Sequence, residues 1–109
     1  MARFRPPPPA VTLTTKQRAH LRSLAHPLKP EFHVGKEGVT VPVLRAIRDA
    51  LRTRELLKVR VLEAAPEDVR ATAAALAEGI EDSAVVQTVG RIVTLYRPDP
   101  DAPQIRLPK

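Results

Sequence analysis

The sequence contains no cysteine, no tryptophan and no long apolar run, and each absence excludes a class of protein. Without cysteine there is no disulfide framework, no thiolate nucleophile and no cysteine-ligated metal. No segment approaches the roughly 18 apolar residues of a membrane-spanning helix. The first residues, MARFRPPPPA, lack the apolar segment of a signal peptide. We therefore expect a cytoplasmic protein with no membrane partner.

Catalytic and metal-binding patterns are missing as well. The three histidines, His20, His26 and His33, do not have the spacing of metal ligands, and no carboxylate cluster accompanies them. No nucleophile elbow, P-loop or dinucleotide fingerprint occurs. We expect no enzyme, and hence no catalytic residue, metal, cofactor or small-molecule substrate.

Positive charge is what the chain does have, and it is unevenly distributed. The net charge is +6 over 109 residues. Residues 1–60 carry thirteen Lys and Arg against four Asp and Glu, whereas residues 61–82 carry one against six. Such segregation is typical of a surface that binds a polyanion, with an acidic side that nucleic acid avoids.

The pattern of apolar residues and turn signals predicts a single domain of alternating helices and strands. A helix from Thr14 or Thr15 is ended by Pro27, and a helix capped by Thr40 follows a short strand. Pro66 opens a third helix, for which Gly79 is a C-cap candidate. The other expected strands cover residues 56–62, 84–89 and 91–97, the last two forming a hairpin through Gly90.

The order α-β-α-β-α-β-β predicts an α/β (α+β) two-layer sandwich with a mixed sheet of about four strands. Residues 1–12 are expected to form a flexible, proline-rich basic arm, residues 13–97 the domain, and residues 98–109 an extended and mostly unpaired tail.

Two features could contact a phosphate backbone. Residues 35–38, Gly35-Lys36-Glu37-Gly38, join a strand to a capped helix, where loop amides and the positive end of the helix dipole favour an anion. The spacing alone fits an ordinary turn better. The following helix carries Arg45, Arg48 and Arg52, which we expect to lie along one line, and Asp49 is expected on another side of the helix. The alternative for this line is a solvated helix face.

Further basic candidates lie on the first helix, at Lys16, Arg18 and Arg22. Aromatic platforms for stacking bases are scarce, because the chain has only Phe4, Phe32 and Tyr96. Phe32 is expected in the core, and Tyr96 is expected to pack its ring rather than stack on a base. Affinity for a nucleic acid would then come mainly from backbone contacts.

Four segments of the chain together resemble the YhbY family, the bacterial stand-alone form of the CRM (chloroplast RNA splicing and ribosome maturation) domain. They are "LTTKQRAHLRSLAHPLKPEFHVGKEGV", "VLRAIRDALRTRELLKVRV", "VVQTVGRIVTLYRP" and "IRLPK". The likeness runs from about Leu13 to the C-terminus.

The resemblance implies a CRM-type RNA-binding domain similar to the C-terminal domain of bacterial translation initiation factor 3. It also implies partners: ribosomal RNA and precursors of the large ribosomal subunit. The family's GxxG loop, an RNA contact, corresponds to Gly35, Lys36, Glu37 and Gly38, although Glu37 places an acid inside it. The alternatives are a translation-associated or general RNA chaperone, or a protein-interaction adaptor.

Overall fold

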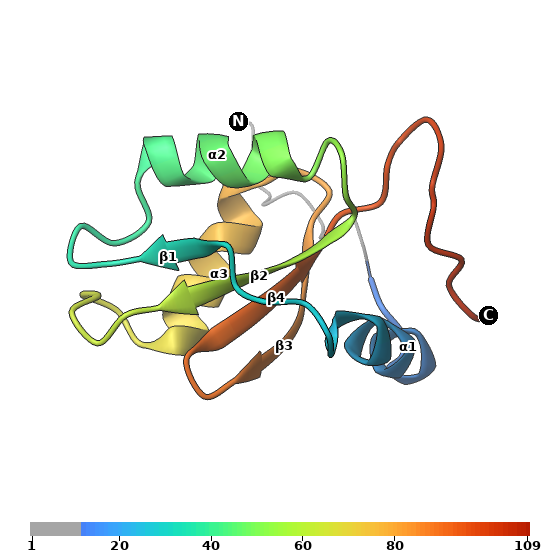
Figure 1. The fold of residues 1–109 in the computed structure, drawn as a ribbon, viewed down its shortest axis with the longest axis horizontal. Helices are drawn as coiled ribbons and strands as arrows, with labels where there is room; N and C mark the ends of the chain where they lie inside the picture. The colour runs from blue at the N-terminus through green and yellow to red at the C-terminus, as the bar shows by residue number, and fades with distance from the viewer. Residues whose placement is uncertain (1–11) are drawn as a thin grey trace, which may run out of the picture.

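The computed structural model describes residues 12–109, which form three helices and one four-stranded sheet (Figure 1). In chain order the elements are α1 (Thr15–Ala25), β1 (Phe32–Val34), α2 (Val41–Ala50), β2 (Leu56–Val61), α3 (Val69–Gly79), β3 (Ala84–Val89) and β4 (Ile92–Tyr96). The predicted arm, apart from Thr12, lies outside the described residues, as does Phe4. Within the described range no helix combines the length and hydropathy needed to cross a bilayer.

The sheet is mixed, with the strand order β1-β2-β4-β3. β1 runs parallel to β2, and the remaining neighbours are antiparallel. β3 and β4 form the hairpin predicted at Gly90, whose φ of 57° is one that glycine adopts without strain. The predicted order of elements and the four-stranded mixed sheet are both confirmed.

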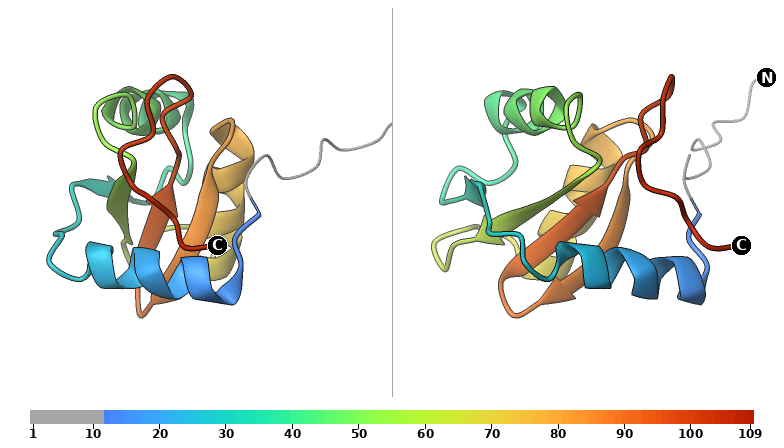
Figure 2. Two further views of the ribbon diagram at one scale, coloured as in Figure 1. Left: turned by 90° about the vertical axis from the view of Figure 1, so that its right-hand side faces the viewer. Right: turned by 45° about the vertical axis from the view of Figure 1, so that its right-hand side comes forward.

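Helices lie on both faces of this sheet (Figure 2). α2 and α3 cover one face, and their Ile47 and Leu76 belong to the main core with Val59, Val93 and Leu95. α1 lies on the opposite face, where Leu21 and Ala25 pack against Leu56, Val86 and Tyr96. The sandwich therefore has an additional, partial layer beneath the sheet.

The alternation predicted for β2 positions its charged residues. Val59 and Val61 are fully buried on the α2 and α3 side, so Lys58 and Arg60 face the side of α1. Arg60 is exposed and Lys58 is half-buried.

Helix starts follow side-chain caps, with one correction to the sequence-based boundaries. Thr14 and Thr40 cap α1 and α2 as expected. α3 begins later than predicted, because the Asp68 carboxylate accepts a hydrogen bond from the Ala71 amide at 2.7 Å and so acts as the N-cap. Pro66 therefore precedes the helix instead of opening it.

Gly79 is not the predicted C-cap, since it is the last helical residue and Ile80 takes an extended conformation. Its missing side chain serves packing. A Cβ at Gly79 would lie 2.7 Å from both δ-carbons of Leu44, which would be a steric clash. Glycine therefore allows α2 and α3 to approach each other closely here.

The C-terminal tail has no helix or strand, but it is not mostly unpaired as predicted. The buried Glu55 carboxylate accepts hydrogen bonds from the backbone amides of Asp99, Gln104 and Ile105 at 2.6, 2.9 and 2.7 Å. Ile105 and Leu107 pack against the second core cluster, which lies between α1 and the sheet. Glu55 thus binds three amides of the tail, and nothing in the local sequence pattern identifies this role.

Candidate nucleic-acid interface

The Gly35–Gly38 loop is a closed turn at the end of β1, directly before α2 (Figure 1). The Gly38 amide donates a hydrogen bond to the Gly35 carbonyl oxygen at 2.9 Å. Lys36 and Glu37 form the exposed corner of this turn. Their two backbone amides donate to no acceptor within residues 12–109, so both can bind a ligand.

The two glycines have different structural roles. Gly38 has a φ of 73°, and a Cβ there would also lie 3.1 Å from Pro66 Cγ, so the turn requires glycine. Gly35 does not have a positive φ, and its Cβ would meet only Leu62 Cδ1 at 3.7 Å, an ordinary contact. The fold therefore accounts for Gly38 but not for Gly35.

The start of α2 offers less to an anion than the sequence suggested. Thr40 Oγ1 already accepts a hydrogen bond from the Val43 amide at 3.3 Å, so this amide is not free for an anion. Pro42 has no N–H to offer. The loop amides, more than the helix end, are the available donors.

The three arginines predicted to lie along α2 are in different environments. Arg45 is exposed, whereas Arg48 donates a hydrogen bond to the Gly79 carbonyl oxygen at 2.8 Å and connects α2 to the end of α3. Arg52 is exposed but lies beyond α2, which ends at Ala50. Asp49 is four residues from Arg45 and therefore on the same helix face, contrary to the prediction.

A further arginine that follows these three, Arg54, is already paired with an acidic side chain. Arg54 forms an ion pair with Glu31 in which both side chains are exposed. Exposed pairs of this kind contribute little to stability. The pair nevertheless lowers the net positive charge just after α2.

The basic residues of α1 are separated from those of α2 by the sheet (Figure 2). Lys16 and Arg22 are exposed. Arg18 donates to the backbone carbonyl oxygens of Val85 and Val86 at 2.5 and 2.8 Å, which fastens α1 to β3. The sequence-predicted set therefore does not form one cluster, and Arg18 and Arg48 are committed to internal contacts.

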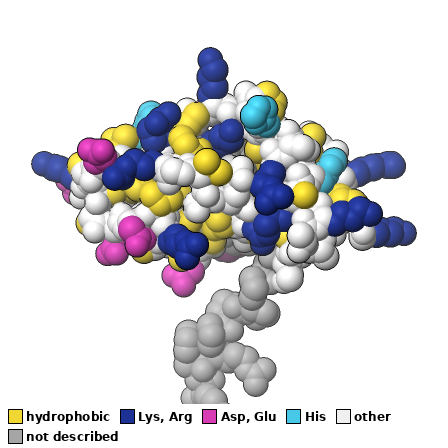
Figure 3. All heavy atoms as spheres, turned by 90° about the horizontal axis from the view of Figure 1, so that it is seen from below, with side chains coloured by type: hydrophobic (Ala, Val, Ile, Leu, Met, Phe, Trp, Pro, Cys, Tyr) yellow, Lys and Arg dark blue, Asp and Glu magenta, His cyan; other side chains and the backbone are white. Residues whose placement is uncertain are grey.

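The face beneath the sheet carries basic side chains that sequence reasoning did not include. Figure 3 shows this face, over which Lys, Arg and His side chains are spread, while the acidic side chains in view lie toward its left and lower edges. Lys58 and Arg60 belong to this face, since they alternate with the buried Val59 and Val61. Their alternation was visible in the sequence, but the partial cover provided by α1 was not.

Aromatic side chains do not provide a stacking platform among the described residues. Tyr96 is only 2% exposed. Its ring packs in the core cluster between α1 and the sheet, as predicted. Burial, with the nearby Glu55 carboxylate as a second cause, raises the pKa of Tyr96. Phe32 is half-buried and packs against the main core.

These features define a small mixed α/β domain with a glycine turn, exposed basic residues and few accessible aromatics. A family model for the CRS1 / YhbY (CRM) domain matches residues 13–97. The chain belongs to the CRS1/YhbY (CRM) domain family.

Relatives of similar length are found in several organisms. The chain is 46% identical to "Probable RNA-binding protein YqeI" of Bacillus subtilis, with 88% of this chain and 99% of the relative covered. It is 42% identical to an "RNA-binding protein" of Haemophilus influenzae, covering 90% and 97%. The solution structure of SAV1595 from Staphylococcus aureus matches with a TM-score of 0.75 and 39% identity, over 89% of this chain and 100% of that one.

Proposed function

We propose that this protein binds RNA, and that its target is ribosomal RNA in precursors of the large ribosomal subunit. RNA binding is supported by the names of the relatives from B. subtilis and H. influenzae. The charge segregation and the exposed basic residues also favour a polyanionic partner. The ribosomal target is the role that the family resemblance implies.

The main support for the loop as an RNA contact is that a glycine stands at position 35 although the fold does not require one. A glycine at a position where neither backbone conformation nor space demands it leaves room for a ligand to approach the backbone closely. The adjacent residues Lys36 and Glu37 are exposed, and their backbone amides have no acceptor among residues 12–109. Together they form a surface on which a phosphodiester can lie against the chain.

In the proposed mechanism these two amides donate hydrogen bonds to phosphate oxygens, and the Lys36 ammonium adds a charge. Arg45 and Arg52 supply further phosphate contacts on the α2 side. Arg18 and Arg48 are left out of this contact set, because their guanidinium groups already bind backbone carbonyl oxygens. Most of the binding energy is then electrostatic and falls with salt.

Substitution of Gly35 tests the loop. Gly35→Ala adds one methyl group at the proposed contact and should weaken binding of ribosomal RNA fragments about tenfold, as measured by fluorescence anisotropy. Because the methyl group has room and Ala restricts the unfolded chain, stability should be unchanged or rise by up to about 1 kcal/mol. Equal affinity of the variant and the parent protein would remove the loop from the interface.

The arginines are tested by the salt dependence of binding. Arg45→Ala combined with Arg52→Ala should reduce the slope of log affinity against log salt by about 0.7 to 0.9 for each lost phosphate contact. Arg70→Ala, which removes an exposed arginine from α3, is the matched control and should leave the slope unchanged.

The ribosomal target is tested separately in cells. Crosslinked RNA should map to large-subunit ribosomal RNA, and the protein should co-sediment with precursors of the large subunit. Co-sedimentation with small subunits or translating ribosomes would favour a translation-associated role instead. RNA spread over many unrelated transcripts would favour a general RNA chaperone.

A further inference from the structure

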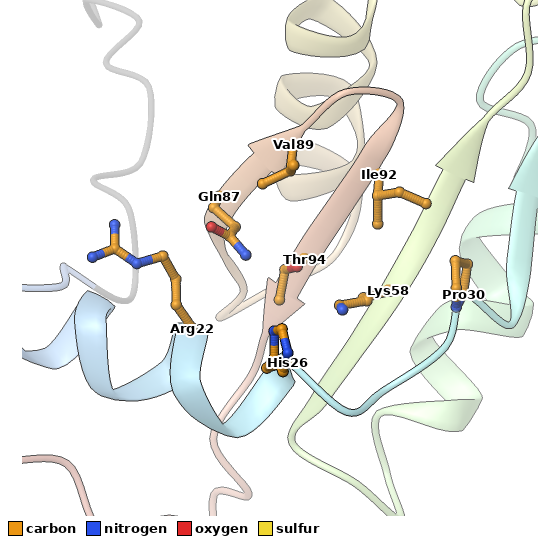
Figure 4. A pocket seen from close by; sticks show the side chains of 8 residues that line it. All are labelled: Arg22, His26, Pro30, Lys58, Gln87, Val89, Ile92 and Thr94. Carbon is orange, nitrogen blue, oxygen red and sulfur yellow. The ribbon is translucent and has the colours of Figure 1, made fainter.

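A hollow of about 230 Å³ lies beneath the sheet, between the end of α1 and the β3–β4 hairpin (Figure 4). It lies apart from the Gly35–Gly38 loop, and none of its lining residues belongs to the proposed phosphate contacts. The lining residues are Arg22, His26, Pro30, Lys58, Gln87, Val89, Ile92 and Thr94.

The register of the sheet explains why the hollow forms. Lys58, Thr94 and Gln87 are direct neighbours across β2, β4 and β3, and so form one row on this face. The adjacent row contains Ile92 and Val89. α1 packs over the other end of the face, on Leu56, Val86 and Tyr96, and covers these two rows only in part.

Thr94 is an unusual member of the floor of this hollow. It is almost completely buried, at 1% exposure, and it lines the hollow; among the described residues, the fully enclosed side-chain atom without a hydrogen-bond partner is Arg97 Nε, not the Thr94 hydroxyl group. The other buried polar side chains of the described residues, Glu55, Thr72 and Ser83, each bind a backbone group elsewhere in the fold. A hydroxyl group in the floor of the hollow can both donate and accept a hydrogen bond from a ligand there.

The chemistry of the lining matches one nucleotide of RNA. Lys58, Arg22 and His26 supply positively charged or donor groups, and no carboxylate lines the hollow. The Thr94 hydroxyl and the Gln87 amide can hydrogen-bond the edge of a base or a ribose hydroxyl. Ile92 and Val89, the latter 61% exposed, provide an apolar surface for the face of a base.

We propose that this hollow binds an unpaired nucleotide of the RNA, with its base against Ile92 and Val89 and its phosphate near Lys58 and Arg22. The inference rests on the proposed RNA-binding function and assigns it a preference for single-stranded RNA. A base inside a duplex cannot enter such a recess, because its faces are stacked and its edge is paired.

The hollow and the loop are close enough for one strand of RNA to reach both. Leu62 is level with the start of the loop, since its amide donates to the Val34 carbonyl oxygen at 2.9 Å. Lys58 precedes Leu62 by four residues, which corresponds to about 13 Å along β2. Phosphate contacts at the loop and a base contact in the hollow can therefore belong to the same RNA segment.

Thr94→Val is the decisive substitution, because it removes the hydroxyl group at nearly constant shape. Affinity for a short single-stranded RNA should fall about three- to tenfold, while the melting temperature stays the same or rises. Thr88→Val is the matched control. Thr88 pairs with Val93, a residue of the main core, and therefore faces the opposite side of the sheet. A melting temperature lowered by Thr94→Val, with affinity unchanged, would show a purely structural hydroxyl and overturn the proposal.

Lys58→Met tests the charge while keeping the length of the side chain. It should weaken single-stranded RNA more than a hairpin duplex of the same composition, whereas Arg70→Met on α3 should affect neither. In nuclear magnetic resonance spectra, a nucleoside monophosphate should shift the amides of Thr94 and Gln87, and inorganic phosphate alone should not. An equal response to both probes would show an anion site without a base contact and overturn the proposal.

These measurements separate the hollow from the proposed function as a whole. If the parent protein binds no RNA, the proposed function fails. If it binds single-stranded and duplex RNA equally, and the binding depends on Gly35 but not on Thr94 or Lys58, only the hollow is refuted. Displacement of the nucleotide by an acidic peptide that binds more tightly than RNA would also overturn the assignment.

Discussion

The Arg48 guanidinium group of α2 donates a hydrogen bond to the backbone carbonyl oxygen of Gly79, 2.8 Å away at the end of α3. The same glycine allows Leu44 of α2 to approach the α3 backbone closely. Two helices separated by β2 in the sequence are thus connected at Gly79. Arg48 therefore has a structural role, although its position in the sequence is that of a surface arginine.

Replacing Arg48 should lower stability. Arg48→Ala leaves a helix-end carbonyl without its partner and should reduce the free energy of unfolding by about 1 to 2 kcal/mol, measured by urea denaturation. Arg45→Ala, on the exposed part of the same helix, should change it by less than about 0.5 kcal/mol. Equal stability of the two variants would contradict the structural role of Arg48.

Local sequence signals were sufficient for much of the fold. Thr14 and Thr40 are caps whose partners lie three residues away, and the alternation in β2 distinguishes Lys58 and Arg60 from the core residues. Such short-range interactions are visible in a sequence. The order of elements and the mixed sheet follow from them.

The features of the site that could not be predicted from the sequence depend on contacts between residues that are distant in the sequence. Arg18 binds carbonyl oxygens 67 and 68 residues away, and Arg48 binds one 31 residues away. No periodicity distinguishes these arginines from Arg22 or Arg45, which remain exposed. Likewise, the row formed by Lys58, Thr94 and Gln87 exists only once strand order and register are known.

The two glycines of the loop should respond differently to alanine. Gly38→Ala introduces a side chain at a φ of 73° and within 3.1 Å of Pro66 Cγ, and should cost at least about 1 to 2 kcal/mol of stability. Gly35→Ala should cost none. Thermal denaturation of the two variants in parallel checks this difference, and a Gly35→Ala variant less stable than Gly38→Ala would contradict it.

Loss of the Glu55 carboxylate should release the C-terminal tail. Glu55→Gln replaces a charged acceptor of three backbone amides with a neutral group, and should cost on the order of 2 to 3 kcal/mol. Hydrogen exchange at Gln104 and Ile105 should accelerate more than exchange in β4. Glu63→Gln, at an exposed position after β2, is the control and should leave the tail protected. Unchanged exchange at Ile105 in Glu55→Gln would refute the anchoring role.

The titration of Tyr96 reports on the same region. Tyr96 is the one tyrosine of the chain, so ultraviolet absorbance follows its ionisation directly. Burial raises its pKa most, and the Glu55 carboxylate raises it further. Glu55→Gln should therefore lower the pKa of Tyr96 only part of the way toward its ordinary value. Because the folded-state pKa is the higher one, stability from this group is present below the unfolded pKa and is lost as pH rises through the folded value.

Acid should loosen the turn that follows β4. The Asp99 carboxylate accepts hydrogen bonds from the amides of Ala102 and Asp101 at 3.1 and 2.8 Å, and these bonds, with a smaller effect of Arg97, lower the pKa of Asp99. Because the folded-state pKa is the lower one, the stabilisation is present above the unfolded pKa and disappears as pH falls through the folded value. The amide resonances of Asp101 and Ala102 should move together in that acidic range. In Asp99→Asn this shared titration should be absent, and its persistence would assign the transition to another carboxylate.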